Sequence, residues 1–88
     1  MSTNALDSLY DQLDADERVV LSDHNWELVD DIRALRRMIN EAWYNHYKGL
    51  SLVVHKGKII AVDESSLQAL NDGANLAGTD NVYLISIR

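Results

Sequence analysis

The sequence predicts an α+β fold in which helices pack on one face of a three-stranded sheet, in the order helix, helix, strand, strand, helix, strand. Apolar residues follow a helical spacing up to residue 49, and then change to two strand-like runs, a further helix and a last strand-like run. Glycines at positions 49, 57 and 78 fall where these segments change. With 88 residues, 47% of them hydrophobic and 25% charged, the chain has the size and composition of a single small domain.

The N-terminal segment, residues 1–21, is predicted to be an acidic helical arm next to a compact body formed by residues 22–88. Its helix is expected over about residues 4–14, with residues 2–4 supplying the cap. Four apolar side chains recur at helical spacing: Leu6, Leu9, Tyr10 and Leu13. Because so short a helix is marginal in water, it must dock on the body or on another molecule. Residues 19–21 are expected to form a brief connector.

A long helix is predicted from a cap at Ser22 or Asp23 to a stop at Gly49. Its apolar side chains step by four and three residues and form a heptad-like seam: Leu28, Ile32, Leu35, Ile39, Ala42 and His46. Such a seam is typical of a helix that lies across a sheet and also of a helix that self-associates. Three heptads do not distinguish these two arrangements.

Three strands are predicted in the second half of the chain. Residues 50–55 and 58–62 form a tight hairpin around Lys56 and Gly57, where glycine supplies the positive φ of a two-residue turn. Residues 82–87 alternate in polarity and form the third strand.

A second helix is expected between the hairpin and the last strand. Residues 63–65 offer capping groups, Leu67 and Leu70 start its apolar face, and Gly73 and Gly78 are expected to bracket its frayed end.

Each predicted strand carries apolar side chains on both of its faces, as in Leu52 and Val54 opposite Val53. A single layer of helices would leave the second face of the sheet uncovered, and monomers rarely expose an apolar patch of that kind. The sequence therefore predicts a homodimer, formed through a sheet face, an edge strand or the long helix.

Charge is distributed unevenly along the chain. The net charge of −6 argues against nonspecific nucleic-acid binding. Nine acidic residues and one arginine give residues 1–31 a local charge of −8, whereas seven basic and five acidic residues give residues 32–88 a charge of +2. A solvated helix face explains this asymmetry, and an acidic arm that contacts a basic partner or imitates nucleic acid is the alternative.

Tyr47 and Gly49 precede the first predicted strand, and Gly57 and Lys58 follow it at the turn. This arrangement, over residues 47–61, resembles a family of small prokaryotic domains of unknown function, in which the second strand leads into a Leu-rich helix and a closing strand. The resemblance covers roughly the last half of the chain and implies a compact module without recognised catalytic residues. The chain departs from the family pattern in lacking a proline before Gly49 and in its long acidic extension.

The residue types present restrict the possible chemistry. The absence of cysteine excludes disulfides, thiolate zinc sites and a cysteine nucleophile. Three histidines, His24, His46 and His55, do not have the spacing of a metal-binding motif, and neither a phosphate-binding loop nor a serine nucleophile elbow is present. We therefore predict no catalytic residue, no metal and no cofactor.

These observations predict a noncatalytic protein-interaction module, a small acidic adaptor or regulator that acts as a homodimer in the cytoplasm. Five side chains are the expected partner-binding residues: Leu6, Leu9, Leu13, Trp43 and Tyr47. One alternative is a nucleic-acid-mimicking inhibitor of a nuclease or DNA-binding protein in a phage or defence context. Another is a nucleotide or small-ligand binder that uses the aromatic end of the long helix. Direct nucleic-acid binding and contact with a membrane are not expected.

Overall fold

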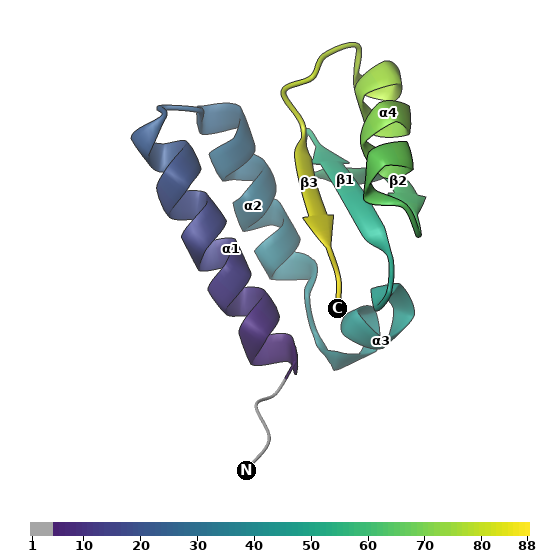
Figure 1. The fold of residues 1–88 in the computed structure, drawn as a ribbon. Coiled ribbons are helices and arrows are strands. Elements are labelled where there is room, and N and C mark those ends of the chain that lie inside the picture. Colours follow the sequence, from purple (N-terminus) through teal and green to yellow (C-terminus); the bar gives the residue numbers. More distant parts are fainter. Residues whose placement is uncertain (1–4) are drawn as a thin grey trace.

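The computed structural model describes residues 5–88 and contains four helices and a three-stranded antiparallel sheet in this range (Figure 1). The helices are α1 (Ala5–Ser22), α2 (Trp26–Met38), α3 (Glu41–Tyr47) and α4 (Ser66–Ala77). The strands are β1 (Ser51–His55), β2 (Lys58–Asp63) and β3 (Tyr83–Ser86), in the spatial order β2-β1-β3. The predicted α+β class, with helices packed on a three-stranded sheet, is confirmed.

Helix α1 is longer than the sequence pattern predicted. It continues to Ser22, so the predicted connector at residues 19–21 is helical. The predicted capping residues 2–4 lie outside the described range. Leu9 and Leu13 are buried against the rest of the chain, so α1 docks on its own body, and that packing supports the additional turns.

The predicted long helix is divided into α2 and α3. Asn25 caps α2 through its side chain, in place of the predicted Ser22 or Asp23, and Asn40 caps α3 by accepting a hydrogen bond from the Trp43 amide at 2.9 Å. Ile39 is extended and ends α2. An asparagine whose side chain bonds its own backbone competes with a continuous helix, which explains the break.

The hairpin between β1 and β2 is confirmed. Lys56 and Gly57 form its two-residue turn with φ of 51° and 77°, the combination of a type I′ turn. The register then shifts, because Val53 pairs with Ala61 whereas Val54 pairs with Ile59. Residue 60 is therefore an extra residue of β2 and forms a β-bulge.

Helices cover both faces of the sheet rather than the one face that was predicted. Leu52 and Val54 belong to a cluster with α1 and α2, whereas Val53 belongs to a second cluster with α4 (Figure 1). The topology explains this arrangement. Strands β2 and β3 run parallel on either side of β1, so α4 is a crossover whose preferred hand restricts it to one face. The α1–α2 hairpin covers the other face.

Gly73 allows α4 to approach the sheet closely. A Cβ atom at this position would lie 2.5 Å from Cγ1 of the buried Val53. The predicted fraying at Gly73 is therefore wrong, and α4 continues to Ala77, followed by Gly78 at φ 70°. The argument for a homodimer from an uncovered sheet face loses its basis, because α4 covers that face. The dimer itself stays a prediction.

Candidate functional site

A groove runs between α1 and β3, and we call it the α1–β3 groove. Its volume is about 450 Å³, within the range of about 300–1,000 Å³ that is common for ligand sites. Nine residues line it: Ala5, Ser8, Leu9, Gln12, Asp16, Leu84, Ile85, Ser86 and Arg88. The α1 residues lie on one helical face, so the helix forms one wall and the outer edge of the sheet forms the other.

The backbone of β3 presents unpaired groups to this groove. Ile87 donates its amide to the Leu50 carbonyl at 2.8 Å and accepts from the Gly49 amide at 2.6 Å, so its polar groups point towards β1. In an antiparallel ladder the direction alternates with each residue, and Ile85 therefore also points inward. Leu84 and Ser86 direct their N–H and C=O groups outward, into the groove.

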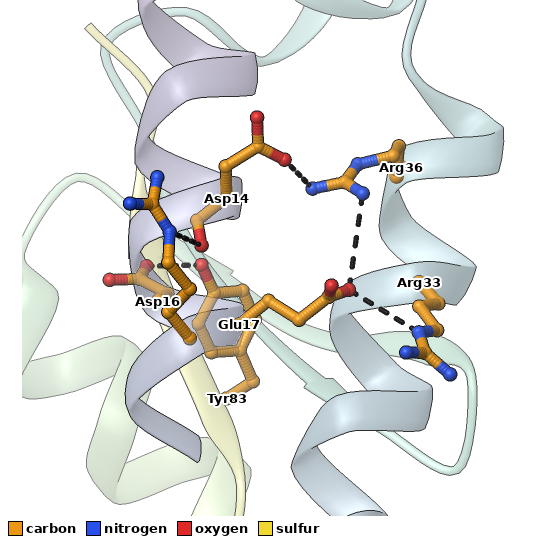
Figure 2. A network of polar contacts seen from close by, with 7 residues as sticks. Asp14, Asp16, Glu17, Arg33, Arg36 and Tyr83 are labelled. Carbon is orange, nitrogen blue, oxygen red and sulfur yellow. Dashed lines mark hydrogen bonds and ion pairs between the residues drawn. The ribbon is translucent and has the colours of Figure 1, made fainter. Parts of the chain in front are cut away.

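A partly buried hydrogen bond holds α1 above this edge. The Tyr83 hydroxyl donates to Oδ2 of Asp16 at 2.5 Å (Figure 2). Gln12 donates to the other carboxylate oxygen of Asp16 at 2.8 Å. Burial raises the pKa of Tyr83, and the bond to the Asp16 carboxylate raises it further, so the hydroxyl keeps its proton. The groove wall is thereby fixed relative to the strand.

Ion pairs between α1 and α2 add to this attachment. Asp14 pairs with Arg36, and Glu17 lies 3.4 Å from Arg33 and 3.9 Å from Arg36 (Figure 2). These side chains are partly exposed, so each pair contributes at most about 1 kcal/mol to stability. Their importance for the site is that they neutralise the carboxylates on the α2 side of α1.

Other acidic side chains of α1, outside the groove, have no such partners within the described part of the chain. Asp7 and Asp11 are exposed on α1 and take part in no ion pair among residues 5–88. Arg88 lines the groove beside β3, and the Tyr44 hydroxyl donates to its carbonyl. The region around α1 therefore keeps a negative field, with one cation in the groove.

All five predicted partner-binding residues belong to one intramolecular hydrophobic cluster. Leu9 and Leu13 are 7% and 0% exposed, and Leu6, Trp43 and Tyr47 are half-buried against the same cluster. The rings of Trp43 and Tyr47 lie 4.8 Å apart at a tilt. The structure thus brings these residues together mainly as a core, in which Leu13 has no surface to offer a partner.

Sequence reasoning missed the groove itself. The available signal was a row of short or polar side chains at helical spacing beside the leucines of α1, formed by Ala5, Ser8 and Gln12. The sequence analysis gave that row no role, because it left open whether α1 docks on its own body or on another molecule. The outward register of Ser86 depends on tertiary pairing and has no signature in the sequence.

The histidines do not form a metal site in the described range, because no three histidine, aspartate or glutamate side chains among residues 5–88 gather as ligands. Within that range no helix combines the length and apolarity required to cross a bilayer. Comparison of the chain with protein-family models, with curated proteins and with solved structures found no match.

Proposed function

We propose that this chain is a noncatalytic protein-interaction module that binds an extended segment of a partner protein as a fourth strand on β3. The observation that supports this function is the pair of outward backbone groups at Leu84 and Ser86, which open into the α1–β3 groove. Strand addition to an exposed edge is an established mode of peptide recognition, in which main-chain hydrogen bonds supply affinity and adjoining side-chain pockets supply specificity.

The position of α1 suits this mode of binding. Neighbouring strands are separated by about 4.8 Å, whereas packed helices lie about 8–10 Å apart. Helix α2 contacts all three strands, and α1 packs beside it on the β3 side. Helix α1 therefore extends past β3 and covers the place that an added strand would take. Alternate side chains of that strand would contact Ser8, Leu9 and Gln12.

A second copy of the chain fits this edge less well than a single extended segment. A twofold axis that pairs β3 with its copy would bring a second α1 to the same face of the sheet. The two helices would then lie over the same two strands, which are about 4.8 Å apart, less than the spacing of about 8–10 Å that packed helices require. An extended segment carries no helix and avoids this overlap.

Charge indicates the chemistry of the partner segment. The net charge of −6 and the unpaired Asp7 and Asp11 attract a cationic partner and repel an acidic one. We therefore propose a segment that alternates apolar residues with lysine or arginine. The nucleic-acid-mimic alternative is weaker, because Asp14, Asp16 and Glu17 are engaged within the chain.

The test uses peptides displayed as a random library and selected on the purified chain. Selected peptides are measured against wild type, Ser86→Pro and Ser86→Ala. Proline removes the outward N–H and places a ring at the edge, so we expect affinity to fall by at least about tenfold. Alanine removes only the 2.8 Å hydroxyl contact to Ser51 and should leave affinity within about threefold.

Two results would contradict the proposal. One is a selected peptide whose affinity is the same for the proline and alanine variants. The other is amide hydrogen exchange in which peptide binding protects residues elsewhere but leaves Leu84 and Ser86 unprotected. Light scattering in the absence of peptide tests the homodimer separately, since a monomer has a mass of 9.9 kDa.

A further inference from the structure

A second pocket lies between α2 and the β1–β2 turn, and we call it the turn pocket. Its volume is about 410 Å³. Eight residues line it: Glu27, Asp30, Asp31, Ala34, Arg37, His55, Lys56 and Gly57. None of them lines the α1–β3 groove, so a ligand in the turn pocket would be independent of the proposed strand addition.

Asp31 is a buried carboxylate with one oxygen available to a ligand. Its side chain belongs to a residue that is 2% exposed, and Oδ1 accepts the Gly57 amide at 2.9 Å. Within the described part of the chain, Oδ2 takes part in no hydrogen bond. Among residues 5–88, however, no fully buried side-chain oxygen lacks a partner. The Oδ2 atom of Asp31 therefore keeps accessible surface in the pocket and can accept a donor there.

Charged residues of both signs line the turn pocket. One side of α2 carries three carboxylates, because Asp30 and Asp31 follow Glu27 by three and four residues. Arg37 and Lys56 take part in no ion pair among residues 5–88. Opposite charges thus line one cavity without pairing with each other.

Lys56 lies at the first position of the turn that borders the pocket. Lys56 has φ of 51°, a left-handed conformation in which asparagine, aspartate or glycine is less strained. The Asp31–Gly57 hydrogen bond fixes the turn that holds Lys56 in this conformation. The same hydrogen bond therefore ties the rim of the pocket to Asp31 on α2.

We propose that the turn pocket binds a basic amino acid, with its side-chain guanidinium or ammonium on Asp31 and its carboxylate on Arg37. A buried carboxylate is best satisfied by charge-assisted donors, and an arginine or lysine side chain supplies them. Asp31 and Arg37 are six residues apart on α2, about 9 Å along its axis at 1.5 Å per residue. The carboxylate of the ligand must therefore be well separated from the cation that binds Asp31, as the side-chain cation of arginine or lysine is and the α-ammonium of a neutral amino acid is not.

The test is a titration of the ¹⁵N-labelled chain with L-arginine, L-alanine and agmatine, which is arginine without its carboxylate. We expect saturable shifts of the Lys56 and Gly57 amides with arginine, affinity for agmatine lower by about tenfold, and no saturation with alanine. Shifts confined to the α1–β3 groove, or equal affinity for arginine and agmatine, would overturn the assignment.

Three variants locate the two ends of the ligand. Asp31→Asn retains an acceptor for the Gly57 amide but removes the charge, so it should lower arginine affinity by at least about tenfold. Arg37→Gln should lower arginine affinity but leave agmatine affinity unchanged. Arg33→Gln is the matched control, because Arg33 pairs with Glu17 and does not line the pocket. Unchanged arginine binding by Asp31→Asn, with its fold verified by the same spectra, would refute the proposal.

Discussion

The two edges of the sheet differ although both are short and antiparallel to β1. Edge strand β2 contains a bulge at Ile60 and has charged residues, Lys58 and Asp63, at its two ends. Edge strand β3 pairs with β1 in uninterrupted register from Tyr83 to Ser86. Bulges and charges are the usual devices that prevent an edge from pairing with another strand.

This difference indicates which edge is available for a partner. On β2 the bulge interrupts the regular row of outward groups, whereas on β3 that row is intact and faces a groove covered by α1. An open edge is a risk of aggregation, and in the proposed function the helix that lies over the edge would limit that risk by leaving room for one strand rather than a second domain. We interpret α1 as the element that converts an exposed edge into a selective site.

The largest expected effect comes from proline at an inward position of β3. Ile85→Pro removes a ladder hydrogen bond and a buried side chain, so it should cost more than about 3 kcal/mol and leave this small domain largely unfolded by circular dichroism. Ser86→Pro, one residue further, should stay folded.

Val62→Pro at the outward edge of β2 should stay folded and keep peptide binding. If Val62→Pro abolished that binding, the two edges would not differ as described.

A second, smaller effect tests how closely α4 packs on its face of the sheet, since the argument from the two edges requires both faces to be covered. Gly73→Ala raises helix propensity by about 1 kcal/mol but places a Cβ atom 2.5 Å from Val53 Cγ1. Overpacking of a rigid β-branched neighbour outweighs the gain, and we expect net destabilisation of about 1–3 kcal/mol in urea unfolding. Asn71→Ala, exposed on the same helix, should be neutral or stabilising. A more stable Gly73→Ala would show that α4 is free to move away from the sheet.

Much of the fold was predictable because local signals and tertiary packing agree. The type I′ turn at Gly57, the helix cap at Ser65 and the strand at residues 83–86 follow from turn chemistry, capping and alternation. The break between α2 and α3 was visible in principle as Asn40, three residues before Trp43. It was overlooked because the heptad-like spacing continues across it.

The site was less predictable because it depends on where distant segments meet. Leu9 and Leu13 were correctly identified as the apolar face of a helix, but only the tertiary structure shows that this face is buried on the chain's own core. The position of α4 on the second face depends on the hand of a crossover. The same limit applies to Asp31, which the sequence presents as one of two adjacent acidic residues and the fold brings to Gly57.

The smallest expected effect is a pH-dependent change in stability at Asp31, which accepts the Gly57 amide in the turn before β2. Burial is the main cause that raises the pKa of Asp31 above 3.8; Asp30 and Glu27 raise it further, and the Gly57 amide and His55 oppose the shift. A carboxyl group whose pKa is higher in the folded state favours folding below its unfolded pKa, and this contribution is lost as pH rises through the folded value.

Wild type should therefore gain stability relative to Asp31→Asn as the pH falls from 7 towards 4. The asparagine keeps an acceptor for the Gly57 amide, so the two proteins should differ by no more than about 1 kcal/mol at pH 7. Urea unfolding at several pH values measures this difference. If the difference in stability instead moved in favour of wild type as the pH increased, Asp31 would stabilise the fold as an anion. The start of β2 would then be held by a charged contact rather than by a buried hydrogen-bond acceptor.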